Sequence, residues 1–168
     1  DKTYRLDSLY DPRQVLDLWF KGLGEDWNLN CKFYMFGLGN GLFARKFLQS
    51  ARPDCVMFIQ EPSCRILKTA LENFDLSDIL EDERVKLIFN PIYDQTALST
   101  VYLELMDYTD IYAYKAGFYP NYPNLFPKEA VEFAEGLQRA REHAGANQIV
   151  HDRFGGDFNR NTFNIRYL

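Results

Sequence analysis

The chain has 168 residues and a formal net charge of −5, from 19 lysines and arginines against 24 aspartates and glutamates. That length fits one domain with its own hydrophobic core, and a content of 16% aromatic residues is atypical of disordered chains. The acidic balance argues against a general nucleic-acid binder, and no apolar run approaches the roughly 20 residues of a membrane span. We therefore expect a globular domain with no nucleic-acid partner and no membrane partner.

Hydrophobic periodicity and glycine or proline positions predict alternating helices and strands up to residue 116. A lead-in helix is expected to begin at Pro12 and to end near Gly22. The next expected elements are a strand at 31–36, a helix at 42–50, a strand at 55–60, a helix at 63–73, a short helical turn at 75–80, a strand at 85–89, a helix at 95–106 and a strand at 111–116. This alternation is typical of a parallel α/β sheet covered on both faces.

From Gly117 the sequence becomes rich in proline and aromatic residues. Three prolines between positions 120 and 127 predict an aromatic connection that is not helical, because proline removes a backbone donor and restricts the residue before it. A long helix is then expected from Pro127 to about His143, with Gly145 ending it, and the remainder is expected to be helical in part.

The expected fold class is α/β: a Rossmann-like three-layer sandwich with a mostly parallel sheet of about four to five strands, plus C-terminal helices. We expect one Rossmann-like domain over 1–168. Within it, a helical lead-in (1–29) precedes the α/β core (30–117), which is followed by the proline-rich connection and the C-terminal helices (118–168).

The strongest local signal is the sequence FGLGNG at 36–41, which follows an expected strand and opens an expected helix. Glycines in that place allow a tight turn and close approach of a phosphate or carboxylate to the helix N-terminus. An acidic residue at the end of the next strand binds ribose hydroxyls in nucleotide-binding α/β folds. The candidate nucleotide-binding residues are therefore Gly37, Gly39, Asn40, Gly41 and Glu61. The alternative is that the glycines only make a tight turn.

No cofactor follows from the sequence with certainty; a nucleotide or an S-adenosylmethionine-like molecule is the ligand expected if the turn binds one, and the spacing G-x-G-x-G suits S-adenosylmethionine better than a dinucleotide. No metal site is expected, since His143 and His151 have no cysteine or carboxylate partner at ligand spacing. The three cysteines are an odd number without metal spacing, which favours reduced thiols in a cytoplasmic protein.

Several short segments, in this order, resemble the N-terminal domain of the motility accessory factor (Maf) glycosyltransferases of bacteria. They are FGLGNG at 36–41, IQEP at 59–62, PNY at 120–122 with LFP at 125–127, and RFGG at 153–156 followed by Asn159, Asn161 and Asn164. The resemblance covers about residues 30–168. The order and spacing of the segments carry it, since each segment alone is unspecific.

The resemblance implies a Rossmann-like domain that precedes a central domain similar to sialyltransferases and related to an archaeal pterin pyrophosphokinase. The family is associated with flagellin O-glycosylation, in which nonulosonic acids are moved from CMP onto Ser or Thr of flagellin. The transferase residues belong to the central domain, so no catalytic residue is carried over to this chain. The chain starts at Asp1 and ends at Leu168 within a helical pattern, so we expect a piece of a longer protein.

The partners implied are the downstream transferase domain of the same polypeptide and flagellin. Candidate interface residues come from the aromatic connection and the asparagine-rich end; they are Tyr119, Asn121, Tyr122, Phe126 and Asn161. The alternative is that the aromatic side chains pack over the sheet edge. Two other functions stay open: a methyltransferase-like nucleotide-binding domain that uses S-adenosylmethionine, and a degenerate Rossmann domain used only for assembly.

Overall fold

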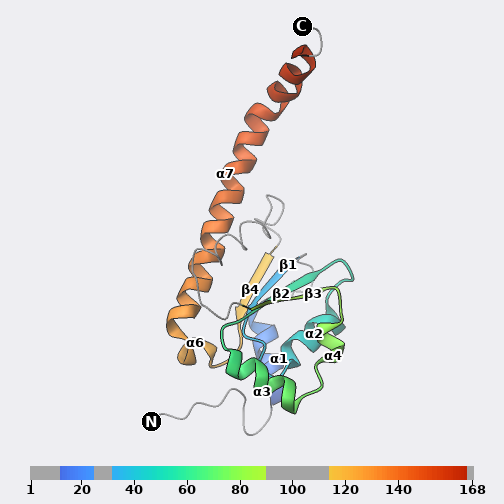
Figure 1. Cartoon of the computed structure of the whole chain (residues 1–168), viewed down its shortest axis with the longest axis vertical. Helices are drawn as coiled ribbons and strands as arrows, with labels where there is room; N and C mark the ends of the chain where they lie inside the picture. The colour runs from blue at the N-terminus through green and yellow to red at the C-terminus, as the bar shows by residue number, and fades with distance from the viewer. Residues whose placement is uncertain (1–11, 25–31, 90–113, 166–168) are drawn as a thin grey trace.

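The computed structural model describes residues 12–24, 32–89 and 114–165. In chain order the elements are α1 (Pro12–Gly22), β1 (Lys32–Phe36), α2 (Leu42–Ser50), β2 (Val56–Glu61), α3 (Cys64–Asn73), α4 (Ser77–Leu80), β3 (Val85–Phe89), β4 (Tyr114–Phe118), α6 (Tyr122–Leu125) and α7 (Pro127–Ile165). Figure 1 shows them around a central sheet, with α7 extending away from it. The expected helix at 95–106 lies outside the described residues.

The described strands form one sheet, and all its pairings are parallel. The order of the strands is β3-β2-β1-β4, so the chain moves from β1 outward to β3 and returns on the other side of β1. Ligands of open α/β sheets bind outside the carboxyl ends of the strands, where the strand order reverses in this way. The expected α/β class with a parallel sheet is confirmed, and the carboxyl ends of β1 and β4 are where a site is to be sought.

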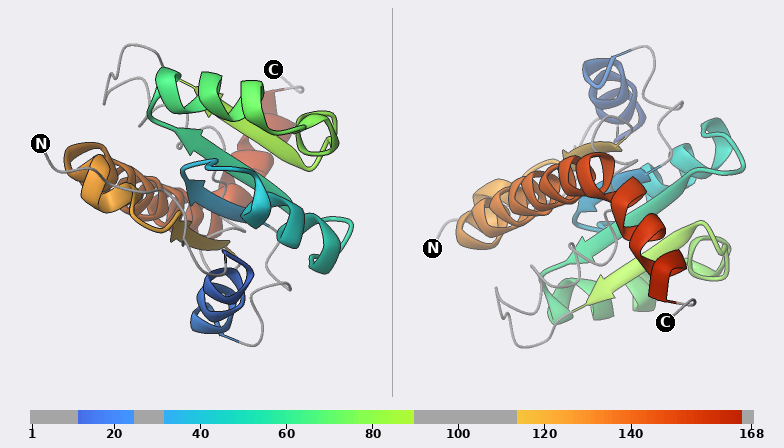
Figure 2. Two further views of the ribbon diagram at one scale, coloured as in Figure 1. Left: turned by 90° about the horizontal axis from the view of Figure 1, so that it is seen from below. Right: turned by 90° about the horizontal axis from the view of Figure 1, so that it is seen from above.

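Helices lie on both faces of the sheet (Figure 2), and successive side chains of a strand point to opposite faces. On one face, Phe33 lies 5.7 Å from Phe47 of α2, measured between ring centroids, and 6.0 Å from Trp19 of α1. On the other face, Phe36 lies 5.3 Å from Phe133 of α7. The core therefore has two layers, one beneath α1 and α2 and the other beneath α7.

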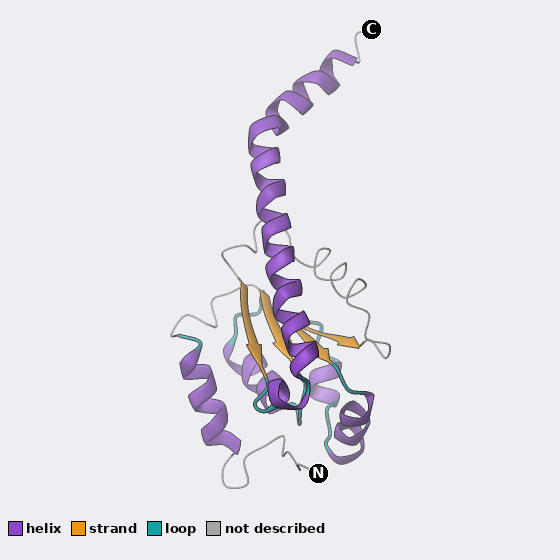
Figure 3. Ribbon diagram, turned by 90° about the vertical axis from the view of Figure 1, so that its left-hand side faces the viewer, coloured by secondary structure: helices purple, strands orange, loops and turns teal. Residues whose placement is uncertain are grey.

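Helix α7 corrects one expectation, because it continues past Gly145 to Ile165 and runs beyond the end of the sheet (Figure 3). Its buried side chains recur every three or four residues; they are Ala130, Phe133, Leu137, Ala140 and Ala144. That spacing gives the helix one apolar face toward the sheet. A glycine within a helix costs only about 1 kcal/mol relative to alanine, so Gly145 alone need not end it.

The proline-rich connection corrects another expectation, since it contains the short helix α6 at Tyr122–Leu125. Pro123 lies in its first turn, where a missing N–H removes no helical hydrogen bond. The preceding residue, Asn121, has φ 66, a left-handed conformation that asparagine tolerates better than most residues. The strand expected at 111–116 is observed as β4 at Tyr114–Phe118, so its predicted end was two residues too early.

Candidate functional site

The glycine-rich turn joins β1 directly to α2. Gly37, Gly39 and Gly41 all have positive φ, at 98°, 57° and 80°, which glycine adopts at little cost. The N–H of Gly37 donates a 2.8 Å hydrogen bond to the carbonyl of Gln60, and this bond ties the turn to β2. The backbone conformation of the turn by itself therefore accounts for glycine at these three positions.

Two tyrosine rings from the segment after β4 cover this turn. A Cβ added at Gly37 would lie 2.5 Å from Cδ1 of Tyr122, and one added at Gly39 would clash with the ring of Tyr119. Both tyrosines are 0% exposed, and their ring centroids lie 5.3 Å apart. The space directly above the turn is thus filled by side chains of the chain itself.

The carboxylate of Glu61 contacts the hydroxyl of Tyr122 at the end of β2, and the residue is 1% exposed. Its Oε2 accepts hydrogen bonds from the N–H of Leu38 at 3.0 Å and from the hydroxyl of Tyr122 at 2.8 Å. Its Oε1 accepts from the N–H of Ser63 at 2.9 Å. Burial raises the pKa of Glu61, and the three donors act in the opposite direction. Burial also raises the pKa of Tyr122 far above its ordinary value, so its phenol is neutral.

Further hydrogen bonds connect the turn to both tyrosines. The hydroxyl of Tyr122 accepts from the N–H of Gly39 at 3.1 Å while it donates to Glu61. The hydroxyl of Tyr119 donates to Oδ1 of Asn40 at 3.0 Å, and the same oxygen accepts from the N–H of Leu42 at 3.0 Å. The turn, the end of β2 and the segment after β4 therefore form one buried polar network.

The structure brings the five candidate nucleotide-binding residues together at the carboxyl ends of β1 and β2. Whether a ligand binds them stays a prediction. Tyr119 and Tyr122 are not among the residues expected at this site, because they are about 80 residues from the turn along the chain. The pairing of β4 with β1 places the residues after β4 beside the turn. Without knowledge of that pairing, the sequence carries no signal for these two tyrosines.

The candidate interface residues have different surroundings. Tyr119 and Tyr122 are buried, so the packing alternative holds for them. Asn121 is exposed and Phe126 is half-buried, with its ring centroid 5.7 Å from that of Tyr122. Asn161 lies within α7, and its side chain is outside the described part. A docking role for Asn121, Phe126 and Asn161 stays a prediction.

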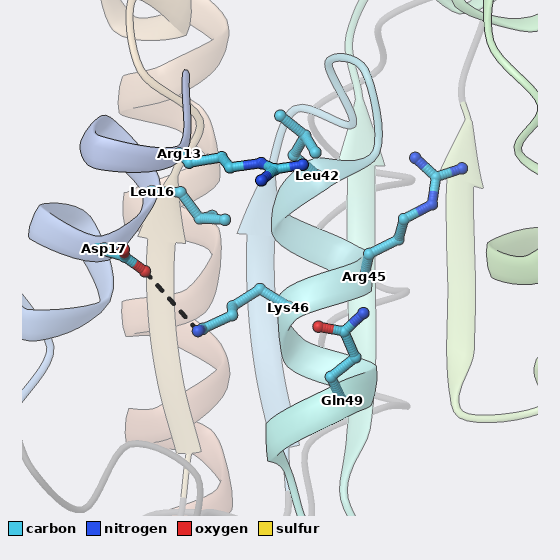
Figure 4. A pocket seen from close by; sticks show the side chains of 7 residues that line it. All are labelled: Arg13, Leu16, Asp17, Leu42, Arg45, Lys46 and Gln49. Carbon is cyan, nitrogen blue, oxygen red and sulfur yellow. Dashed lines mark ion pairs between the residues drawn. The ribbon is translucent and has the colours of Figure 1, made fainter. Parts of the chain in front are cut away.

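A groove of about 350 Å³ separates α1 from α2 (Figure 4). Its lining is mostly charged or polar, and consists of Arg13, Leu16, Asp17, Leu42, Arg45, Lys46 and Gln49. Lys46 and Asp17 form an ion pair across it at 3.7 Å, and Arg45 pairs with Asp78 at 2.8 Å. The groove is therefore lined by paired charges and is open to solvent. None of its lining residues belongs to the glycine turn.

Within the ranges 12–24, 32–89 and 114–165, no group of three or more histidine, cysteine or acidic side chains could hold a metal ion. Among the helices of these same ranges, none has both the length and the apolar character needed to cross a membrane.

No protein-family model matches the sequence, and no curated protein matches it. Among solved structures, a protein-L-isoaspartate O-methyltransferase matches with a TM-score of 0.36 and 18% identity, over 53% of this chain and 32% of that one. A "putative O-methyltransferase" from Klebsiella pneumoniae matches with a TM-score of 0.37 and 16% identity, over 83% of this chain and 70% of that one. This chain thus spans about a third of the first structure. At these TM-scores and identities, the likenesses carry no conclusion about its activity.

Proposed function

We propose that this chain is an accessory, non-catalytic Rossmann-like domain of a larger Maf-like glycosyltransferase, where it positions a neighbouring domain or the flagellin acceptor. The observation that carries this proposal is the closed glycine turn. Tyr119 and Tyr122 fill the space above Gly37 and Gly39 that a nucleoside would need. A Rossmann-like domain without room for a nucleoside at this turn is suited to positioning rather than to catalysis.

The hydrogen bonds of Glu61 support the same proposal. A carboxylate that binds a ribose is expected to have oxygen lone pairs that face open space and can accept hydrogen bonds from the ribose hydroxyls. Here both oxygens of Glu61 accept bonds from the chain itself, and the residue is buried. Because buried polar groups are costly to leave unpaired, a ligand would have to replace the hydroxyl of Tyr122 as well as its ring.

A transfer assay tests the non-catalytic part of the proposal. The chain alone is mixed with a CMP-activated nonulosonic acid and unmodified flagellin, and glycosylated flagellin is measured by intact mass. We expect no transfer by this chain and transfer by a polypeptide that joins it to the downstream transferase domain. Transfer by the chain alone would contradict an accessory role.

An association experiment tests the positioning part. Sedimentation of the chain with the separate transferase domain is expected to show a complex, and the joined protein is expected to be more stable than either part. Asn121→Gly keeps the left-handed backbone and removes an exposed side chain, so we expect weaker association. Lys68→Gln, on the exposed side of α3, is the control. No association together with no gain in stability would end the positioning proposal.

A second candidate function is a methyltransferase-like domain that binds S-adenosylmethionine. The observation that favours it is the position of Glu61, which ends β2 and accepts a bond from the glycine turn at Leu38. In that candidate the hydroxyl of Tyr122 takes the place of a ribose hydroxyl, and S-adenosylmethionine displaces the segment from Tyr119 to Phe126.

Calorimetry distinguishes the two candidates. The methyltransferase candidate requires S-adenosylmethionine to bind, and Glu61→Ala to abolish that binding. The accessory proposal expects no heat of binding up to about 1 mM ligand, which corresponds to a binding free energy weaker than about −4 kcal/mol. Binding at micromolar concentration that is lost in Glu61→Ala would favour the methyltransferase candidate over the accessory one.

A further inference from the structure

An open cavity of about 160 Å³ lies beside the closed turn, between the turn and α3. The turn contributes Gly39 and Asn40 to its lining, and α3 with the residue that follows it contributes Arg65, Ile66, Thr69, Ala70 and Phe74. The turn follows β1 and α3 follows β2, so the cavity lies at the carboxyl ends of two parallel strands. It is therefore at the edge where open α/β sheets bind ligands.

The wall that faces the turn is apolar. Ile66 and Ala70 are four residues apart, which places them on one side of α3, and Phe74 follows the helix directly. Phe74 is 47% exposed. Part of its ring is therefore available to pack against a bound molecule.

The rim of the cavity carries one cation and one hydroxyl. The guanidinium of Arg65 is exposed and makes no ion pair with any residue that the structure describes. The hydroxyl of Thr69 donates a 2.8 Å hydrogen bond to the carbonyl of Arg65, so its oxygen can still accept one. The charge at the rim is therefore positive, although the chain as a whole has a net charge of −5.

The volume of the cavity limits what it can hold. Pockets for drug-sized ligands measure about 300–1,000 Å³, whereas an apolar cavity of about 150 Å³ accepts a single benzene ring. At about 160 Å³, this cavity is too small for a whole nucleoside with further groups and is suited to one ring.

We propose that this cavity binds a single aromatic ring that carries an anionic substituent. The ring packs between Phe74 and Ile66, and the anion lies at the guanidinium of Arg65, which favours carboxylates and phosphates. This inference goes beyond the accessory role and does not rest on it, because the cavity is open while the glycine turn is closed.

Titration of the ¹⁵N-labelled chain with four small probes, followed by amide NMR, tests the proposal. Benzoate and phenyl phosphate are the anionic rings, benzyl alcohol is the neutral ring, and acetate is the anion without a ring. We expect both anionic rings to shift the amide signals of Gly39, Asn40 and Ala70, and acetate to leave them in place. Benzyl alcohol is expected to bind more weakly, and the tighter of the two anionic rings identifies the anion as carboxylate or phosphate.

Two variants separate the contributions of charge and ring. Arg65→Gln is expected to weaken the binding of benzoate by about fivefold, the effect of losing an exposed ion pair, and to leave the binding of benzyl alcohol unchanged. Phe74→Ala is expected to weaken the binding of both benzoate and benzyl alcohol. Because Phe74 is partly exposed, the substitution is expected to leave the fold intact. Lys68→Gln, which lies in the exposed Lys68–Glu72 pair, is the control that should change neither.

The proposal is overturned if no ring probe, at concentrations up to about 10 mM, shifts the amide signals of Gly39 or Asn40. It is also overturned if acetate shifts these amides as strongly as benzoate does. Equal benzoate affinity in the wild-type chain, Arg65→Gln and Phe74→Ala would place any binding elsewhere. None of these results depends on glycosyl transfer, so the failure of one proposal is distinguishable from the failure of the other.

Discussion

The hydroxyl of Tyr122 donates a 2.8 Å hydrogen bond to Oε2 of Glu61, a residue 61 positions earlier in the chain. The same hydroxyl accepts a 3.1 Å bond from the N–H of Gly39. One phenol thus joins the glycine turn after β1, the end of β2 and the segment after β4. These segments meet because β1 lies between β2 and β4 in the sheet.

Tyr122→Phe removes this hydroxyl and keeps the ring that covers the turn. We expect a loss of about 1–2 kcal/mol in the free energy of unfolding, because a buried N–H of Gly39 loses its acceptor. Urea unfolding followed by circular dichroism measures the change. Tyr114→Phe, at a half-buried position of β4, is the control and should change stability by less than about 0.5 kcal/mol. Equal effects of the two variants would show that the Tyr122 hydroxyl adds nothing to stability.

Gly39→Ala is expected to be strongly destabilising, by about 2–4 kcal/mol, since a Cβ there meets the ring of Tyr119 and φ is +57°. Gly22→Ala is its matched control: nothing lies within 4 Å of a Cβ at Gly22, which is the last residue of α1. That change should leave stability unaltered or raise it by up to about 1 kcal/mol. Thermal unfolding of both variants checks the pair, and a mild effect at Gly39 would mean that the tyrosines do not close the turn.

The pH dependence of stability reports on Glu61, whose pKa is raised by burial. A buried carboxyl with a raised pKa binds its proton more tightly in the folded state than in the unfolded state. Its contribution is therefore full below the unfolded pKa and is lost as pH rises through the folded pKa. We expect the stability of the wild-type chain relative to Glu61→Gln to be greatest below the ordinary glutamate pKa and to fall as pH rises above it.

The comparison with Glu61→Gln is needed because Asp54, Asp75, Asp78 and Asp82 have lowered pKa values and act in the opposite direction. Their contributions are common to both proteins and cancel in the difference. Urea unfolding at a series of pH values measures this difference. If the relative stability of the wild-type chain rose with pH, the hydrogen bonds to Glu61 would outweigh its burial.

Phe133→Ala tests whether α7 is held to the sheet by its aromatic contacts. The ring of Phe133 is buried, 5.3 Å from Phe36 and 5.4 Å from Phe118 between centroids. Its loss should cost about 3–5 kcal/mol in unfolding free energy. Val131→Ala, on the exposed side of the same helix, should cost less than about 0.5 kcal/mol. Similar costs in the two variants would mean that α7 does not depend on this contact.

Expectations that rested on local signals agree with the structure where the signal was strong. The apolar run at 31–36, the hydrophobic periodicity at 63–73 and the glycines of the turn are all signals within a few residues of one another, so they indicated β1, α3 and the strand-to-helix turn. The end of α7 was predicted wrongly, because one glycine costs a helix only about 1 kcal/mol relative to alanine and Gly145 does not end it.

The sequence determined the α/β class, the glycine turn and the place of Glu61 at the end of a strand, because periodicity and backbone preference act over short distances. It left open whether the turn is occupied and whether the aromatic residues after β4 face outward or inward. Only the tertiary structure decided that Tyr119 and Tyr122 cover the turn. The reason is that strand order is set by packing between distant segments, and the β1–β4 pairing brings together residues about 80 positions apart.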